Sequence, residues 1–472
     1  AAANITSVNG DTWTHGLSAT AWVWGYDEYG TAAQGKPGNV DGGQFGYSSP
    51  VQIIETFTDN EEWSAIGVGE ATTHFIKNGT LWAVGSDYGV FGRGDDTVNQ
   101  RLSAPIQIGS KSDWSSIRGS FYVCFGVDTS GKLYSWGSEA YQGSGRLGQG
   151  TTAVSKSVPT QIGSATNWVP NKVQGSRYTN HAVNAAGELY SWGSSGNGRI
   201  GDGTVIARSV PVQIAGTDWD HVASTGGATV AIKTDGTLWS WGAAGNGCLG
   251  DGQSAVHRSS PVQVGTDTDW GRIESGTFNY GGSIFCVKTD GTLWSWGANT
   301  MGQLGHGDVA ARSSPTQVGS ATNWVYDEYG YMDVSDRNLQ IINQDGELWC
   351  VGWNDTFGGV GDSTNINRST LVQVGTATDW LRVEETLGLT GFQEVLGFGA
   401  MTNTEQQRRV FLEMLVAVNL HTVLRYKSLK HLLTMRNGLL LELAIMLFIL
   451  LKMELFGLLV KITEHLAVAM RH

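Results

Sequence analysis

Proline, cysteine and charged residues are scarce in this chain, and each shortage narrows what the protein can be. Of 472 residues, 8 are proline, 4 are cysteine and 15% are charged, against roughly a quarter charged in average domains. The net charge of −13 argues against binding nucleic acid through a basic surface. The cysteines form no C-x-x-C pair, so we expect free, buried thiols and neither a metal site nor a disulfide framework. They are Cys124, Cys248, Cys286 and Cys350.

Glycine and tryptophan are abundant, with 66 and 19 residues, and both recur at regular spacing. The segment KTDGTLWSWG occurs at 233–242 and again at 288–297, and related segments end in a glycine at Gly85, Gly137, Gly193 and Gly352. A second marker is a tryptophan that usually follows Asp or Asn, with steps of 50 to 56 residues between successive markers. The markers are Trp13, Trp63, Trp114, Trp168, Trp219, Trp270, Trp324 and Trp380. Eight markers bound seven repeating units, which predicts a repeat architecture.

Each unit has the same internal order of short apolar runs. Two runs are joined by an Asp-Gly or Asn-Gly pair, which predicts a β-hairpin with a type I′ turn. A glycine-rich loop follows, and the unit ends in a segment such as RSSPTQVG (312–319). Proline before a short Val or Ile run suits an edge strand, because no hydrogen bond of the sheet is lost there. Four short strands in about 52 residues indicate one blade of a β-propeller.

These motifs, D-G-T-L-W-S-W-G, G-x-L-G-x-G and S-S-P-x-Q-V, resemble the repeat of the regulator of chromosome condensation family over residues 13–379. The resemblance implies an all-β fold, a seven-bladed propeller of four-stranded blades. We therefore predict a propeller over residues 13–385, with residues 1–12 completing the last blade.

The repeated side chains are predicted to be structural. We expect one recurring tryptophan per unit to pack between blades: Trp24, Trp82, Trp136, Trp192, Trp241, Trp296 and Trp349. A structural hydrogen-bonding role is expected for Arg258 and Arg312, which precede S-S-P. The lone loop histidines His257 and His306 have no partner at metal-ligand spacing. The loop acids Asp202, Asp251 and Asp308 could bind a cation, although solvated loop acids are commoner. No catalytic motif is found, so we predict no enzyme activity, cofactor or metal.

The end of the chain differs in character, since no tryptophan follows Trp380. Residues 438–460 read GLLLELAIMLFILLKMELFGLLV, and Glu442, Lys452 and Glu454 interrupt this run, so we do not expect a membrane anchor. An apolar, helical C-terminal domain is one interpretation of residues 386–472. The other interpretation is that this tail is not a genuine domain.

A shift of reading frame supports the second interpretation. Back-translation of 452–457, read two bases later, allows N-G-T-L-W, the sequence of 78–82. In the same frame, 396–410 allow the sequence of 22–35. We therefore interpret 393–472 as an out-of-frame copy of blades one and two, and predict that the undamaged gene repeats the propeller in tandem or that its assembly duplicates this region.

Since no catalytic group is found, the leading hypothesis is a non-enzymatic protein-interaction or structural repeat module on a cell surface, secreted or in a virion. A protein partner is expected, without nucleic acid or membrane. The founding member of the family implies an alternative, a guanine-nucleotide exchange factor for a small GTPase. A secreted enzyme inhibitor that binds through one propeller face is the third hypothesis.

Overall fold

The structure, a computed structural model, describes strands and loops from residue 21 to residue 398. The described residues are 21–26, 46–52, 63–68, 72–87, 90–94, 100–120, 122–139, 144–152, 154–276, 282–326, 331–335, 337–354, 359–380, 382–385 and 394–398. The predictions for residues 1–12 and for most of the tail, including 438–460, fall outside these residues. Within the described part, no helix combines the length and hydropathy needed to cross a bilayer.

Six four-stranded antiparallel sheets each come from one continuous stretch of chain, with the strands adjacent in sequence order. We call the four strands of a sheet A, B, C and D in that order. The first three sheets comprise β3 (Trp63–Val68), β4 (Thr72–Lys77), β5 (Thr80–Asp87) and β6 (Gln100–Ile108); β7 (Trp114–Gly119), β8 (Val123–Asp128), β9 (Leu133–Gly137) and β10 (Lys156–Gln161); and β11 (Trp168–Gly175), β12 (Thr179–Asn184), β13 (Leu189–Gly193) and β14 (Arg208–Gln213).

The next three sheets repeat this order. They comprise β15 (Trp219–Ser224), β16 (Ala228–Lys233), β17 (Leu238–Gly242) and β18 (Arg258–Gln263); β19 (Trp270–Ser275), β20 (Ser283–Lys288), β21 (Leu293–Gly297) and β22 (Arg312–Gln317); and β23 (Met332–Val334), β24 (Asn338–Ile342), β25 (Leu348–Gly352) and β26 (Arg368–Gln373). Short 3-10 turns, η1 (Gly196–Gly198) and η2 (Gly245–Gly247), lie in two of the loops between strands C and D.

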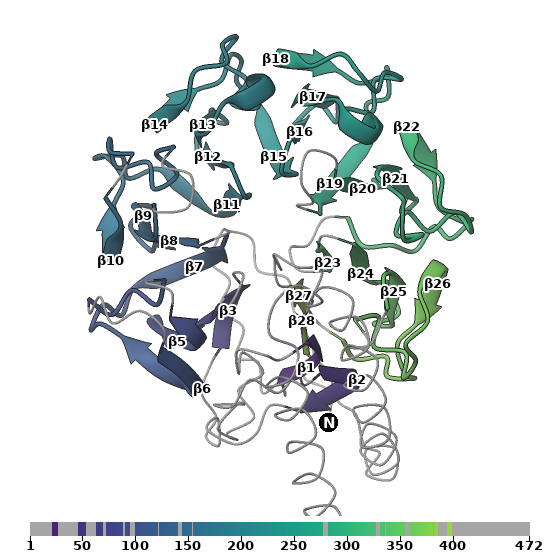
Figure 1. The fold of residues 1–472 in the computed structure, drawn as a ribbon, viewed down its shortest axis with the longest axis horizontal. Helices are drawn as coiled ribbons and strands as arrows, with labels where there is room; N and C mark the ends of the chain where they lie inside the picture. Colours follow the sequence, from purple (N-terminus) through teal and green to yellow (C-terminus); the bar gives the residue numbers. More distant parts are fainter. Residues whose placement is uncertain are drawn as a thin grey trace, which may run out of the picture. The chain divides into compact units, whose positions relative to one another are not determined.

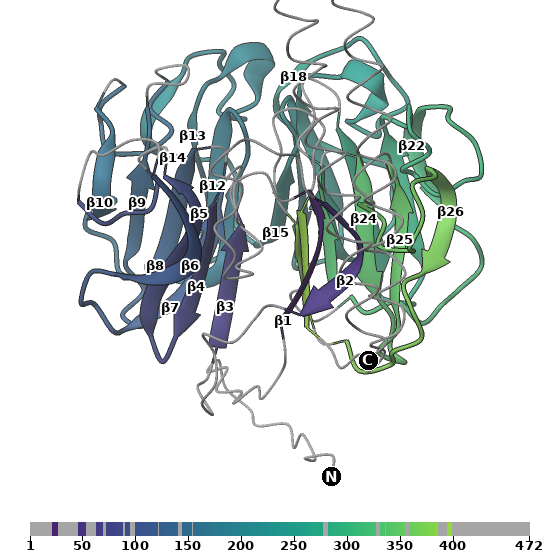
Figure 2. The ribbon, with the colours of Figure 1, turned by 60° about the horizontal axis from the view of Figure 1, so that its bottom comes forward.

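A seventh sheet joins the two ends of the described chain. Its strand order is β2-β1-β28-β27, where β27 is Arg382–Glu385, β28 is Glu394–Phe398, β1 is Ala21–Tyr26 and β2 is Gly46–Gln52. Strand β1 pairs antiparallel with β28, from Ala21 opposite Phe398 to Gly25 opposite Glu394. Strands A and B of this closing sheet therefore come from late residues, and strands C and D from early ones (Figure 2).

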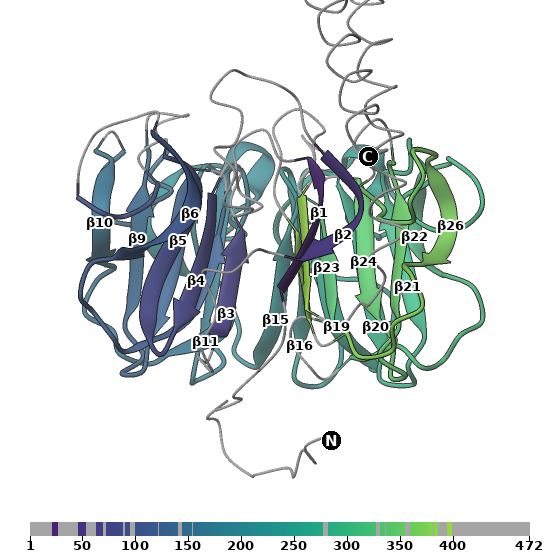
Figure 3. The same ribbon diagram turned by 90° about the horizontal axis from the view of Figure 1, so that it is seen from below.

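The seven sheets form a ring. Successive A strands contact one another in the order β3, β7, β11, β15, β19, β23 and β27, and β27 contacts β3. Figure 1 shows the sheets around a common centre, with the D strands outermost, and Figure 3 shows the same sheets from the side. The predicted seven-bladed, all-β propeller is confirmed.

The division of the ring into units differs from the prediction. Gly25 follows Trp13 by only 12 residues, whereas Gly85 follows Trp63 by 22, so the first unit is too short to hold strands A and B before strand C. Strands β27 and β28 fill that place. The closing sheet therefore extends past residue 385, to Phe398, and its outer strand is β2. The prediction for residues 1–12 concerns residues that the structure does not describe.

The hairpin turns between strands B and C also differ in part. Asn78 and Gly79 have φ of 49° and 73°, as a type I′ turn requires. In the turn at Asp235 only Gly236 has a positive φ, of 77°, so this is a longer turn with glycine in the left-handed conformation. Asp235 Oδ1 accepts the amide and hydroxyl of Thr237 at 3.0 and 2.6 Å, and these bonds stabilise the longer turn.

Candidate interaction site

The second tryptophan of strand C joins neighbouring blades. Trp136, Trp192, Trp241 and Trp296 each have 0% exposure. Their indole N–H groups donate to backbone carbonyls in the C–D loop of the preceding blade, those of Val90, Arg146, Arg199 and Cys248, at 2.8 to 3.1 Å. Burial of the ring and this hydrogen bond together fix the position of each blade against the next.

Two other tryptophans of the predicted core set occupy a different position. Trp82 and Trp349 are opposite Phe75 and Ile341 on strand B, the place that Trp239 holds in its blade. They are only half-buried, and Val84 and Val351 stand where the other blades have the inter-blade tryptophan. The repeat motif concealed this difference, because L-W-A-V-G and L-W-C-V-G contain one tryptophan of the two. The side chain of Trp24 lies outside the description.

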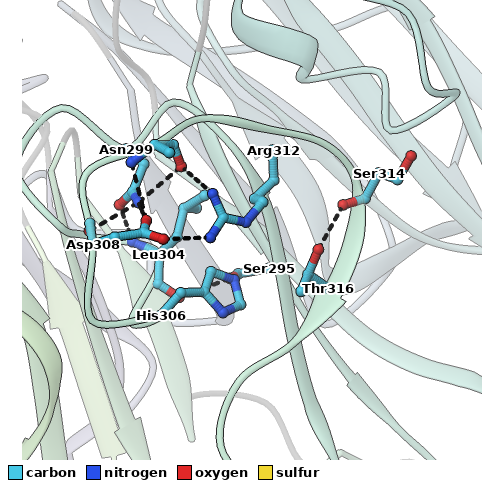
Figure 4. A network of polar contacts seen from close by, with 9 residues as sticks. Ser295, Asn299, Leu304, His306, Asp308, Arg312, Ser314 and Thr316 are labelled. Atoms are coloured by element: carbon cyan, nitrogen blue, oxygen red, sulfur yellow. Dashed lines mark hydrogen bonds and ion pairs between the residues drawn. The ribbon is translucent and has the colours of Figure 1, made fainter.

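The loops between strands C and D are held by ion pairs between predicted site residues. In four blades, an aspartate of the C–D loop accepts a hydrogen bond from the arginine that begins strand D of the same blade. The pairs are Asp202 with Arg208, Asp251 with Arg258, Asp308 with Arg312, and Asp362 with Arg368. In the blade of Figure 4, Asp308 Oδ2 lies 2.6 Å from Arg312, and Asn299 donates to the Asp308 carbonyl at 3.1 Å. The arginine occupies each carboxylate that we had considered for a cation.

These ion pairs affect the acidity of the carboxylates. Hydrogen bonds from Arg312 lower the pKa of Asp308. Burial opposes the shift at Asp202, but the bonds from Thr204 and Arg208 still lower its pKa. The loops of Asp202 and Asp308 therefore keep their ion pairs at neutral pH.

The loop histidines bond locally. His257 Nδ1 accepts the Ala244 amide at 3.1 Å, and His306 Nε2 lies 3.0 Å from Ser295 Oγ (Figure 4). Among the described residues, no group of three His, Cys, Asp or Glu side chains could hold a metal ion.

Two buried histidines were not singled out from the sequence. His74 and His181 occupy the same register on their B strands, opposite Ala83 and Ser191. Burial lowers the pKa of His74 to about 4 and that of His181 to about 3. His74 Nδ1 lies 3.6 Å from the Cys124 sulfur, but burial raises the pKa of that thiol. A neutral thiol beside a neutral imidazole lacks the thiolate that a nucleophilic cysteine needs.

Four charged side chains from three blades, with a glutamine from a fourth, meet on the A strands, and we call them the axial cluster: Arg118, Arg272, Glu274, Asp333 and Gln174. Glu274 lies 2.6 Å from Arg272 and 3.8 Å from Arg118, and Arg118 lies 4.0 Å from Asp333. Gln174 reaches Glu274 at 3.4 Å. The cluster ties together non-adjacent blades. Its only regular signal in the sequence is that Arg118 and Glu274 each lie four positions after a marker tryptophan, Trp114 and Trp270.

Exposed apolar side chains gather at the outer edge of the ring. Every large apolar side chain that the described residues expose lies in a C–D loop or a D strand. Seven come from three consecutive blades, and we call them the rim cluster: Val154, Val158, Val205, Ile206, Val210, Val256 and Val262. Val309 and Ile366 lie in the C–D loops of the next two blades.

The ion-paired loops present these side chains to solvent. Asp202 holds Thr204 and Arg208 at either side of Val205 and Ile206, which are 66% and 59% exposed. Exposed apolar side chains grouped on a rigid support are typical of protein-binding surfaces. Sequence reasoning missed this cluster, although four C–D loops have a Val or Ile two positions before the Arg or Lys that begins strand D: Val154, Ile206, Val256 and Ile366.

Comparison with known proteins gives a consistent picture. Residues 186–232, 235–277 and 290–331 match the regulator of chromosome condensation (RCC1) repeat. The chain is 28% identical to the ultraviolet-B receptor UVR8 of Arabidopsis thaliana over 286 residues, 59% of this chain and 51% of UVR8. It is 32% identical to the mouse E3 ubiquitin-protein ligase HERC2 over 203 residues, 42% of this chain and 4% of HERC2.

The solved structures agree on the fold. Prp20p of Saccharomyces cerevisiae superimposes with a TM-score of 0.65 at 16% identity, covering 84% of this chain and 94% of Prp20p. At that identity the similarity shows the fold alone.

Proposed function

Because the chain belongs to the RCC1 repeat family and folds as its propeller, we propose that it is a non-enzymatic module that binds a protein partner through the rim cluster. The observation that carries the proposal is the confinement of exposed large apolar side chains to C–D loops and D strands in the described part of the chain. Propellers of this family bind proteins, as the study of Prp20p with Gsp1p and histones illustrates. The low charge and repetitive composition support a module displayed outside a cell or on a virion.

The rim cluster suits binding because its support is rigid. Each loop is fixed at one end by the tryptophan bond to the next blade, as between Arg199 and Trp241 at 3.1 Å, and at the other by an Asp–Arg pair. Little conformational entropy is then lost on binding. The charges beside the apolar residues are already paired, so a partner does not have to desolvate an isolated carboxylate.

The test is capture of one partner by matched variants. A photo-crosslinking residue in the loop of Val205 and Ile206 identifies the partner in material from the source organism. The variant Ile206→Asp with Val210→Asp should then lose that partner. Ile366→Asp, an equally exposed loop residue outside the three blades, should retain it, and all variants should keep the wild-type thermal midpoint.

The alternative functions predict other outcomes. An exchange factor accelerates nucleotide release from a small GTPase, and an inhibitor lowers the activity of a captured enzyme. The proposal would be overturned if the double variant Ile206→Asp with Val210→Asp kept the partner. It would also be overturned if the chain had exchange activity that this double variant left unchanged.

We also propose that residues beyond the closing sheet are an out-of-frame copy of the first blades. The support lies in the sequence, where shifted codons of 396–470 allow most residues of 22–95. In the unshifted frame, the codons of 396–427 would encode a second version of strands β1, from Trp22 onward, and β2, so the copy begins within β28. Nucleotide sequencing of the native locus tests this directly. The native sequence should differ from the one that encodes this tail by a single inserted or deleted base, and its frame should encode the Asn-Gly-Thr-Leu-Trp motif near residue 455.

A further inference from the structure

A buried carboxylate in the blade of β7 to β10 has an oxygen without a partner. Glu139 lies two residues after β9 and is 0% exposed. Its Oε1 atom accepts the Leu147 amide at 2.6 Å. Its Oε2 atom has no hydrogen-bond donor, and in the described part of the chain no Arg, Lys or His pairs with it. Because buried charges in proteins are paired with an opposite charge or bound to a metal ion, this oxygen needs a positive partner.

Two other blades have a hydrogen-bond donor at this position. Asn299 and Asn354 correspond to Glu139, since the Oδ1 atom of each accepts the equivalent loop amide, at 2.9 and 3.0 Å. Their Nδ2 atoms donate to the carbonyls of Asp308 and Thr364 at 3.1 and 3.0 Å, and Figure 4 shows this contact for Asn299. In the blade of Glu139, a carboxylate oxygen replaces the donor that serves these loop carbonyls.

A second buried oxygen without a partner lies in the same C–D loop. Thr151 corresponds to Thr204 and Asp308, because the glycine before each donates its amide to strand D of the following blade. The Thr204 hydroxyl donates to Asp202 at 2.7 Å. Gln149 stands in place of Asp202 and bonds strands C and D of its own blade, so the Thr151 Oγ1 atom has no partner. The loop therefore contributes a carboxylate, a hydroxyl and a carbonyl oxygen.

The ion pair that fixes four other C–D loops is absent from the described part of this loop. Gln149 replaces the aspartate of that pair and Lys156 replaces the arginine, and Lys156 forms no ion pair with a described residue. Arg146, in the same loop, donates to the carbonyls of Ser138 and Arg177, at 3.1 and 3.2 Å. Glu139 is therefore left without a direct counter-ion among the described residues.

We propose that this loop binds a calcium ion through the Glu139 Oε2 atom and the hydroxyl and carbonyl oxygens of Thr151, with water completing the coordination. Ca²⁺ accepts carboxylate and neutral oxygens in a flexible arrangement, whereas Mg²⁺ demands a near-ideal octahedron. The ion would hold this loop as the Asp–Arg pair holds the others. A single carboxylate implies weak binding, with a Kd of about 0.1–1 mM. The inference does not depend on the proposed function of the rim cluster.

The test is thermal unfolding of the full chain in a calcium chloride series, after metal ions have been removed with EDTA. The midpoint of the wild type should rise by roughly 1–2 °C for each tenfold increase in calcium above the Kd, and magnesium at the same ionic strength should have a smaller effect. Glu139→Asn should fold, because Asn299 and Asn354 hold the same position, and should lose the calcium response. Asp113→Asn, which removes a carboxylate that is 47% exposed, should keep it.

A second measurement does not depend on stability. Terbium bound beside Glu139 should luminesce when tryptophan is excited, and calcium should displace it. Thr151→Val, which keeps the shape of the side chain and removes the hydroxyl, should weaken terbium binding at least several-fold. A wild type whose midpoint ignores calcium, or a calcium response or terbium signal that Glu139→Asn retains, would overturn the inference. An equal response to sodium, magnesium and calcium at one ionic strength would overturn the choice of ion.

Discussion

Single residues in this ring have roles set by their register within the blade. Trp239 and Trp241 are two residues apart on strand C, yet Trp241 is fully buried and bonds the neighbouring blade while Trp239 is half-buried. Residues two apart on a strand point to the same face of the sheet. The two tryptophans therefore differ only in their position along the strand. Trp239 lies near the end of its strand beside Lys233, whose ammonium is 5.0 Å from the ring centroid.

The first prediction compares these two tryptophans. Trp241→Ala should lower the free energy of unfolding by about 3–5 kcal/mol, the range for emptying a buried aromatic site, and Trp296→Ala should do the same. Trp239→Ala should cost clearly less, because part of its ring is already in water. Chemical denaturation measures all three, and a loss under about 1 kcal/mol for Trp241→Ala would contradict an inter-blade role.

The second prediction concerns pH. Because burial lowers the pKa of His74 to about 4 and of His181 to about 3 in the folded protein, while the unfolded values are near 6.5, the unfolded chain binds more protons below pH 6.5. The contribution of these residues is therefore complete above about pH 6.5 and is lost as pH falls toward 4. Each histidine adds at most about 1.4 kcal/mol per pH unit to this loss.

A matched variant separates the histidines from the carboxylates. Gln340 holds the same register in β24, so the double variant His74→Gln with His181→Gln should fold and should lose less stability between pH 7 and pH 5 than wild type. Urea unfolding at pH 7 and at pH 5 measures the stability that each protein loses between the two pH values. If the double variant loses as much stability as wild type, the histidines are protonated in the folded state.

At the scale of strands, the A strands carry the charges that cross the ring. Arg118 lies on β7, Glu274 on β19 and Asp333 on β23, and these strands belong to three different blades. Each is at the register where strand A points to the centre. Removing one member of a buried pair leaves the other charge uncompensated, which costs more than the pair contributes.

The third prediction follows from this cluster. Glu274→Ala should lower the free energy of unfolding by about 3–5 kcal/mol, because Arg272 and Arg118 both lose a carboxylate. The control is Asp113→Ala, which breaks the ion pair between Lys111 and Asp113. The Asp113 side chain is 47% exposed, so this change should lower the free energy of unfolding by about 1 kcal/mol or less. Equal losses in the two variants, or a Glu274→Ala effect that disappears in high salt, would show that the cluster is open to solvent.

At the scale of the whole molecule, stability depends on closure of the ring between β1 and β28. These strands pair in an antiparallel register, from Ala21 opposite Phe398 to Gly25 opposite Glu394. The first residues of the segment that we interpreted as an out-of-frame copy therefore have a structural role, because Glu394–Phe398 form β28.

The fourth prediction is a pair of truncations. A chain ending at Met401 should keep the thermal midpoint of the full chain, or exceed it, since the out-of-frame segment was not selected to fold. A chain ending at Gln393 should lose at least several degrees, because β1 and β27 become open edges. Differential scanning calorimetry tells the two apart, and an unfolded 1–401 chain would contradict the interpretation of the tail.

The sequence by itself determined the repeat, the number of blades and the four strands of each, because turn glycines, marker tryptophans and apolar runs are local signals that recur at constant spacing. It also indicated edge strands, since proline reports a missing amide. Only the tertiary structure decided which repeats share a sheet at the closure, which tryptophan of a pair faces the next blade, and that Arg118 meets Glu274. Those contacts join residues far apart in the chain, and their energies depend on distances between blades that no local pattern encodes.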